Sequence, residues 1–174
     1  MGSRGGAFHL AIGSGVRRSI VVTIESGSDL LETLEEVAKR ESLKNAAVLS
    51  GVGSLNKASF RNIETTPGRG ADAGSQLLTK GPRMTLRNLS GPMEIISLEG
   101  NITRDDNDRS VLHLHGMVSD EEARVFGGAL SRGCEVSRQV EVFILEMGGV
   151  ELRRVLSPET GSKNLVPTVS LKRG

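Results

Sequence analysis

The chain is poor in aromatic residues. Among its 174 residues there is no tryptophan, no tyrosine and only four phenylalanines. A hydrophobic fraction of 37% is still enough for a core. That core must be built from valine, isoleucine, leucine and methionine, which interdigitate without adding polar groups that need partners. The length corresponds to one ordinary domain, large enough to bury well over half of its unfolded surface.

Cysteine and long apolar runs are scarce as well. The single cysteine, Cys134, excludes an intrachain disulfide and a cysteine-rich zinc site. It lies in an alternating segment, so we interpret it as a small buried residue rather than a nucleophile. No run reaches the roughly 18 apolar residues of a membrane span, and the N-terminus lacks the order of a signal peptide. We therefore expect a cytoplasmic protein that contacts no membrane.

An excess of charge of either sign is also lacking. The 22 basic and 21 acidic residues leave a formal net charge of +1. Proteins that bind nucleic acid by neutralising phosphates usually carry a basic face or tail. The balance does not support such a face, although a local patch is compatible with it. We interpret most of the arginines as solvated residues or ion-pair partners.

The motifs of common enzyme classes are missing. The sequence has no nucleophile elbow, no H-E-x-x-H and no Walker motif. Gly51 and Gly53 form a G-x-G without a P-loop lysine, which we interpret as a turn. His113 with Asp120 would suit acid–base chemistry, but no nucleophile is placed to complete the set. We therefore favour a protein that is not an enzyme and keep an uncharacterised enzyme as the alternative.

Alternating and β-branched segments are what the chain has in quantity. One amphipathic segment, 30–43, predicts a helix, because its leucines share a face and its acidic residues precede its basic ones. The polar residues 26–29 provide its turn and N-cap. Strands are expected at 18–25, 45–55, 57–63, 84–89, 93–103, 111–118, 135–147 and 150–156.

Polar and glycine-rich stretches predict the connections: a loop at 64–75, a hairpin turn at 105–110, and a turn or short helix at 119–122 that leads into 125–130. We divide the chain into a flexible N-terminal segment (1–16), one domain (17–166) and a C-terminal tail (167–174). Many strands with one strong helix favour an α+β fold.

Three segments, in this order, resemble the PPC family (plant and prokaryote conserved domain): AVLSGVGSL at 47–55, GPMEIISLEG at 91–100 and HLHGMVSDEEARVFGGAL at 113–130. Arg154 with 159–161 resembles the closing segment of that family. The resemblance implies a central, mostly antiparallel β-sheet flanked by helices, assembled as a homotrimer. Plant members also carry an AT-hook, which this sequence lacks, so the chain looks like a stand-alone prokaryotic member.

The same resemblance implies a partner-contacting or interface segment. Its members come from the second and third motifs: Gly91, Met93, Glu94, Ile95, Ile96, Ser97, Gly127 and Gly128. Glu94 is a lone acid in an apolar strand, and burying it would be costly without a partner. We expect an arginine of the same or a neighbouring subunit beside it. The Gly127–Gly128 pair is expected to allow close backbone packing.

His113 and His115 lie two apart on a predicted strand, so both side chains face the same side. This spacing offers two imidazoles to a zinc ion, which needs a third or fourth ligand. The resemblance implies that the family's third histidine stands where this chain has Ala129. Asp120, Glu94 or a residue of another subunit would have to substitute for it. The other interpretation is two histidines hydrogen-bonded at a pocket or subunit interface.

These observations lead to two hypotheses. The first is a homotrimeric PPC-domain protein, a candidate DNA-binding and regulatory module that contacts other proteins and binds DNA weakly without an AT-hook. The second is a metal- or small-molecule-binding protein, or an uncharacterised enzyme, that uses His113 and His115 at a subunit junction. Zinc is the cofactor that the second hypothesis names.

Overall fold

The computed structural model describes residues 11–64, 84–157 and 161–170. These residues form one eight-stranded sheet in the order β1-β6-β2-β5-β4-β3-β7-β8, with a further pairing of β2 and β3. All pairings are antiparallel except a single parallel contact of β3 with β7. The elements are β1 Gly15–Glu25, α1 Leu30–Arg40, β2 Ala46–Ile63, β3 Met84–Arg104, β4 Ser110–Ser119, β5 Val125–Leu130, β6 Val136–Gly148, β7 Val150–Leu156 and β8 Lys163–Val169.

The predicted helix is confirmed as α1, and its N-cap is Asp29. The Asp29 Oδ1 atom accepts the backbone N–H groups of Leu31 and Glu32 at 2.9 and 3.0 Å, which satisfies two donors that the first turn leaves unpaired. Its Oδ2 atom accepts the N–H groups of Gly133 and Cys134, and so ties the helix to the turn before β6. The buried face consists of Leu30, Leu31, Leu34, Val37 and Ala38.

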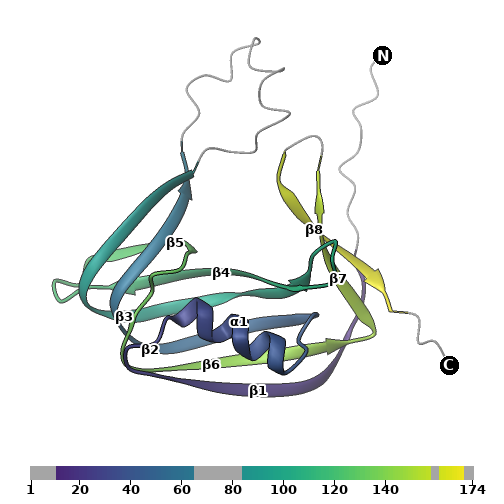
Figure 1. Ribbon diagram of the computed structural model, residues 1–174, viewed down its shortest axis with the longest axis horizontal. Coiled ribbons are helices and arrows are strands. Elements are labelled where there is room, and N and C mark those ends of the chain that lie inside the picture. Colours follow the sequence, from purple (N-terminus) through teal and green to yellow (C-terminus); the bar gives the residue numbers. More distant parts are fainter. Residues whose placement is uncertain (1–10, 65–83, 158–160, 171–174) are drawn as a thin grey trace, which may run out of the picture.

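The prediction of a sheet flanked by helices is wrong in its second part. Within the described residues α1 is the one helix, and it lies across one face of the sheet beside β2 and β6 (Figure 1). The segment at 119–122 forms a tight turn instead of a helix, because the Asp120 Oδ1 atom accepts the N–H groups of Glu122 and Arg124. The molecule is therefore mostly β.

The strands β2 and β3 are each continuous where we predicted two strands: β2 runs through position 56, and β3 runs through positions 90–92. The predicted glycine turn in β2 is absent as well. Gly51 and Gly53 make no turn; they let neighbouring strands approach. A β-carbon on Gly51 would lie 2.4 Å from the Leu98 Cδ2 atom. Gly53 has a φ of +144°, and a β-carbon there would lie 2.2 Å from the Gln139 carbonyl oxygen. Bulges between Val48 and Ser50 and between Gly53 and Leu55, rather than a turn, accommodate the bend.

The length of β2 lets it pair with three strands. Its first part pairs with β6, and its end pairs with β5 through Phe60↔Leu130 and Arg61↔Ala129. The strand β3 pairs with both β2 and β4, and β4 pairs with β5. The four strands β2, β3, β4 and β5 thus form a closed ring of pairings. The ring places the end of β2 beside β5, which lies far from it in sequence.

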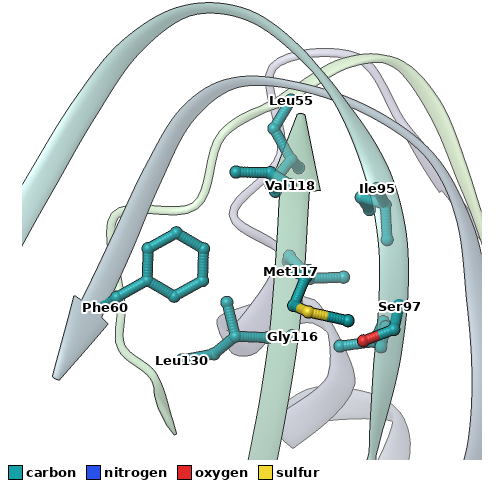
Figure 2. A pocket seen from close by; sticks show the side chains of 10 residues that line it. Leu55, Phe60, Ile95, Ser97, Gly116, Met117, Val118 and Leu130 are labelled. Carbon is teal, nitrogen blue, oxygen red and sulfur yellow. The ribbon is translucent and has the colours of Figure 1, made fainter. Parts of the chain in front are cut away.

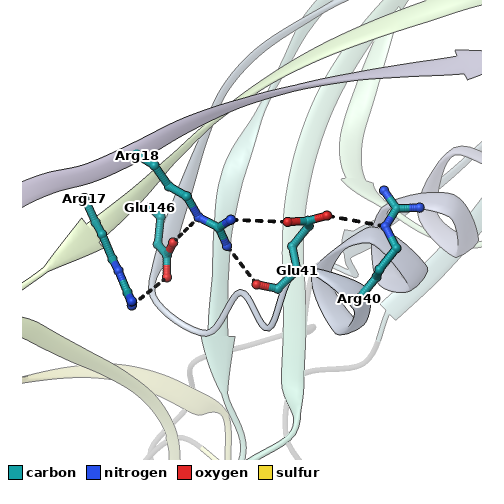
Figure 3. A network of polar contacts seen from close by, with 5 residues as sticks. All are labelled: Arg17, Arg18, Arg40, Glu41 and Glu146. Carbon is teal, nitrogen blue, oxygen red and sulfur yellow. Dashed lines mark hydrogen bonds and ion pairs between the residues drawn. The ribbon is translucent and has the colours of Figure 1, made fainter.

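The core between α1 and the sheet is aliphatic, as the composition predicts. Phe60 is the one phenylalanine among the fully buried side chains of the described residues. The carboxylate of Glu146 is also buried, and it accepts the Arg18 Nε–H group at 2.6 Å (Figure 3). Arg18 continues to the Glu41 carbonyl oxygen at the end of α1, at 2.8 Å. This network joins β6, β1 and the helix.

The ends of the domain differ in detail from the prediction. The strand β1 begins at Gly15, inside the segment that we predicted to be flexible, and β8 pairs with β7 as far as Val169, beyond the predicted boundary at 166. Most of the predicted loop at 64–75 lies outside the described residues. None of the helices that the structure describes is long and apolar enough to cross a membrane.

Candidate functional site: a histidine pair on the open face of the sheet

The strand β4 places His113 and His115 on the side of the sheet that faces away from α1. Their neighbours Leu114 and Val118 are buried in the core, whereas both histidines are exposed. We call this side of the sheet the outer face. The two Nε2 atoms lie 3.2 Å apart, and the ring centroids lie 5.1 Å apart. The imidazoles therefore form a pair, as the spacing predicts.

The strands that pair with β4, and β2 beyond them, place further side chains next to the histidine pair on the outer face. Register partners share a face, and they form the row Leu86–Arg61–Ala129–His115–Glu99 across β3, β2, β5, β4 and β3 again. A second row places Asn101 opposite His113. The guanidinium of Arg61 and the imidazole of His115 therefore flank Ala129, at the position where the resemblance implies a third histidine.

The side chain of Arg154, on β7, contacts Asn101 of β3, which is the register partner of His113. Its Nη2–H group donates to the Asn101 Oδ1 atom at 2.7 Å, and its Nη1–H group donates to the Lys163 carbonyl oxygen at 3.3 Å. The Nε–H group is buried and has no hydrogen-bond partner. Partial burial lowers the pKa of this guanidinium from its ordinary value.

The electrostatics at His113 favour its neutral imidazole. Partial burial lowers the pKa of His113 below its ordinary value. The positive charges of Arg154 and Arg61 lower this pKa further, as does the second imidazole. Neutral imidazole is the form that binds a metal ion, but two positive charges close by oppose the arrival of a cation.

The histidine pair fits half of a zinc site. Two nitrogen ligands of a tetrahedral zinc ion, each about 2.0–2.1 Å from the metal, lie about 3.3 Å from one another, close to the 3.2 Å between the Nε2 atoms. Within the described residues, however, no group of three histidine, cysteine, aspartate or glutamate side chains is placed to hold a metal ion. Asp120 instead pairs with Arg124 at 2.7 Å. His9 lies outside the described residues.

The predicted interface segment divides into buried and exposed members. Met93 and Ile95 belong to the protein's own core, which leaves them unavailable to a partner of this chain. Ser97 is half-buried beside that core. Gly91, Glu94 and Ile96 are exposed. Glu94 and Ile96 thus alternate with core residues, and a contact of the exposed members with a partner stays a prediction.

Glu94 has no ion-pair partner among the described residues, so the expected arginine is not one of these, and an arginine of a neighbouring subunit stays a prediction. It lies opposite Ser54 of β2 and Ser119 of β4, and its side chain is exposed. An exposed carboxylate keeps its hydration, so the cost that would require a partner does not arise.

Gly127 and Gly128 serve close packing. A β-carbon on Gly127 would lie 2.6 Å from the Gly116 carbonyl oxygen. Gly128 has a φ of +156°, and a β-carbon there would lie 2.4 Å from the Asn62 Oδ1 atom. The two glycines therefore let β5 approach β4 and β2, and so hold Ala129 next to the histidine pair.

Neither the core cavity nor the cysteine offers an alternative site. The cavity inside the ring of strands has a volume of about 10 Å³ and is lined mainly by apolar side chains, among them Leu55, Phe60 and Leu130 (Figure 2). Such a volume holds one water molecule at most. Cys134 is fully buried, and burial raises the pKa of its thiol, so it is a packing residue, as predicted.

The outer face also carries exposed apolar side chains on β1, β6, β2 and β3. Val21 and Phe143 are register partners there, and both alternate with core residues. Leu49, Val52 and Ile96 lie on the neighbouring strands, and the five side chains are between 40% and 61% exposed. This apolar cluster and the histidine pair share one uncovered side of the sheet.

The sequence predicted the histidines but not the residues around them. Arg61, Asn101 and Arg154 come from β2, β3 and β7, and no spacing links them to His113. Only the pairing of distant strands brings them together. Arg154 was singled out through the family's closing segment, without a role.

A model of the Plants and Prokaryotes Conserved (PCC) domain, the family called PPC above, matches residues 12–148. The bifunctional protein GlmU of a Synechococcus species is 30% identical over 135 residues, and the AT-hook motif nuclear-localized protein 29 of Arabidopsis thaliana is 29% identical over 113 residues. These matches cover 78% and 65% of this chain. The chain spans only 18% and 34% of the lengths of those two proteins.

Solved structures share the fold. A metal-containing protein from Archaeoglobus fulgidus has a TM-score of 0.72 at 23% identity, over 91% of this chain and 99% of that one. A plant- and prokaryote-conserved protein from Pyrococcus horikoshii has a TM-score of 0.70 at 22% identity, over 94% and 100%. A candidate DNA-binding protein from Ralstonia eutropha has 0.66 at 20%, over 84% and 89%. Identities this low show the fold alone. With the family model matching most of its length, the chain belongs to the PPC family.

Proposed function

We propose that this protein is a self-assembling regulatory module that forms a homotrimer through its outer face and associates weakly with DNA and with other proteins. The observation that carries the proposal is the uncovered apolar cluster of Val21, Leu49, Val52, Ile96 and Phe143. Exposed apolar side chains gathered on one face are typical of interaction sites. The near-zero net charge removes a repulsion between copies.

Weak DNA association follows from the family and from the charges. The relatives include an AT-hook nuclear protein and a candidate DNA-binding protein. Many of this chain's arginines are engaged with acids, as Arg132 is with Glu32 and Glu35 of α1. Few positive charges therefore remain for phosphates, so any DNA complex is weak, and its affinity falls with added salt in proportion to the few phosphates contacted.

Light scattering after gel filtration tests the assembly. The wild-type protein is expected to elute as a trimer, and Phe143→Lys is expected to dissociate it while leaving the circular dichroism spectrum unchanged. Leu156→Lys is the matched control, because Leu156 is 58% exposed but lies at the end of the β7–β8 hairpin. A monomer at micromolar concentration for the wild type would refute the proposal. Gel-shift titrations at rising salt test the DNA component.

A second candidate function is a ligand site at the histidine pair. The distance of 3.2 Å between the Nε2 atoms favours it, and a protein of the same fold from Archaeoglobus fulgidus is metal-containing. In this chain His113 and His115 would hold the metal, and a third ligand would have to come from solvent or from another copy. Metal analysis of untagged protein tests the idea: the site requires bound zinc that the His113→Ala, His115→Ala double variant loses.

A further inference from the structure

Two arginines near the histidine pair lack a carboxylate partner in the part of the chain that the structure describes. Arg61 and Arg154 both lie close enough to His113 for their charges to lower its pKa. Neither arginine has a carboxylate partner within 4 Å among residues 11–64, 84–157 and 161–170. Arg17, Arg18 and Arg132, by contrast, all pair with glutamates. Guanidinium groups from two strands that lie near the same side chain and have no carboxylate partner are typical of a site for an anion.

Arg154 is also incompletely satisfied. Its two terminal nitrogens donate to neutral oxygens of Asn101 and Lys163, and its buried Nε–H group has no acceptor. A half-buried cation that contacts only neutral oxygens keeps most of its charge uncompensated. An anion beside it would supply the missing compensation.

Ala129 leaves room at the same point. As a register partner of both Arg61 and His115, it lies about 4.5–5.5 Å from each, measured between β-carbons. A histidine at this position would fill the space between them. With alanine there, only a methyl group stands between Arg61 and His115 in this row of register partners.

Among the described residues, the row of register partners that contains His115 carries one acid. Glu99 is the register partner of His115 on the outer face. It forms no ion pair with either histidine or either arginine within the described residues, and it is exposed. The balance of formal charges around the pair therefore stays positive, with two guanidinium groups against one solvated carboxylate.

We infer that this part of the outer face, between β2, β4 and β7, binds a small phosphate-like dianion, held by Arg61 and Arg154 beside the histidine pair and Asn101. The inference rests on the second candidate function, a ligand site at the histidine pair, and names the class of its ligand. It does not depend on self-assembly. If copies do meet through the outer face, the anion lies at their junction.

Inorganic phosphate is the probe, with metal-free, untagged, full-length protein at pH 8 and constant ionic strength. Isothermal titration and thermal unfolding are expected to show saturable binding and a rise in Tm. Arg61→Gln and Arg154→Gln are each expected to weaken binding about tenfold or more, because each removes a charge-assisted hydrogen-bond donor. Arg61 is exposed, so its replacement tests the site even if the Arg154 variant fails to fold.

Three further variants sharpen the test. Glu99→Gln is expected to tighten binding, because it removes the acid opposite His115. Ala129→Leu is expected to weaken binding without a change of charge, by placing a bulky side chain between Arg61 and His115. Arg132→Gln is the control: this exposed arginine pairs with Glu32 and Glu35 on α1, so phosphate affinity stays unchanged.

A short DNA duplex distinguishes a nucleic-acid phosphate from a free one. If the ligand is a free anion, Arg61→Gln weakens phosphate binding and leaves duplex binding unchanged. If Arg61→Gln weakens both to the same extent, the site binds the phosphates of DNA, and the inference is overturned. Absence of saturable phosphate binding up to about 10 mM would also overturn it. Wild-type protein that binds zinc but not phosphate would refute the anion and sustain the second candidate function.

Discussion

His115 and Ala129 lie opposite each other across the β4–β5 pair, so their β-carbons project from the same side of the sheet. An imidazole at position 129 would therefore stand beside the two that β4 already provides. This relationship means that one substitution separates the present pair from a three-histidine site.

Ala129→His is accordingly expected to raise zinc affinity by about tenfold or more, because a third nitrogen ligand completes most of a tetrahedral shell. Competition with a chromophoric chelator, in untagged protein, measures the change. Ala123→His in the β4–β5 turn is the control for an added surface histidine. Equal zinc affinities of the wild type and the Ala129 variant would contradict the placement of the pair.

Glu146 is expected to contribute to stability through the network with Arg18. The carboxylate is 7% exposed and accepts the Arg18 Nε–H group at 2.6 Å. Glu146→Gln is expected to lower the free energy of unfolding by about 1–3 kcal/mol, since it removes a charge-assisted hydrogen bond at a buried acceptor. Urea denaturation measures the loss. Glu122→Gln, in an exposed ion pair, is expected to have little effect.

Gly53 is expected to tolerate no side chain. Its φ of +144° is rarely adopted by other residues, and a β-carbon would lie 2.2 Å from the Gln139 carbonyl oxygen. Gly53→Ala is expected to cost about 3 kcal/mol, because strain and a backbone clash add. Gly15→Ala is the control, with nothing within 4 Å of its β-carbon. Equal urea midpoints for the two variants would show that β2 and β6 are less closely packed than described.

The turn between β4 and β5 is expected to make stability depend on acidic pH. The hydrogen bond from Arg124 lowers the pKa of Asp120, and the backbone N–H groups of Arg124 and Glu122 contribute. Because this pKa is lower in the folded than in the unfolded chain, the contribution is complete above the unfolded value of about 3.9. It is lost as the pH falls through the folded value.

Asp120→Asn is therefore expected to lower stability at pH 7 and to flatten its decline towards pH 3. Urea midpoints across that range measure both effects. Asp106→Asn, in the turn between β3 and β4, serves as the control. If the two variants lose stability in parallel at every pH, the Asp120 carboxylate is not the titrating group.

Features that depend on neighbours in the chain were predicted correctly, whereas features that depend on residues far apart in sequence were not. The helix after Asp29 and the hairpin turn at 105–110 were predicted, because capping and turn formation depend on neighbours in the chain. The glycines of β2 were misinterpreted as a turn. Their role is to let Leu98 and Gln139 approach, and those residues lie far away in sequence.

By itself, the sequence determined the aliphatic core, the position of α1, the alternation that buries Leu114 and exposes His113 and His115, and membership of the family. Those properties follow from composition, local periodicity and motif order. The tertiary structure alone decided that β2 returns to β5 and that Arg61 and Arg154 meet the histidine pair. Such meetings depend on the register between strands distant in the chain, and register is set by how the whole sheet buries its apolar side.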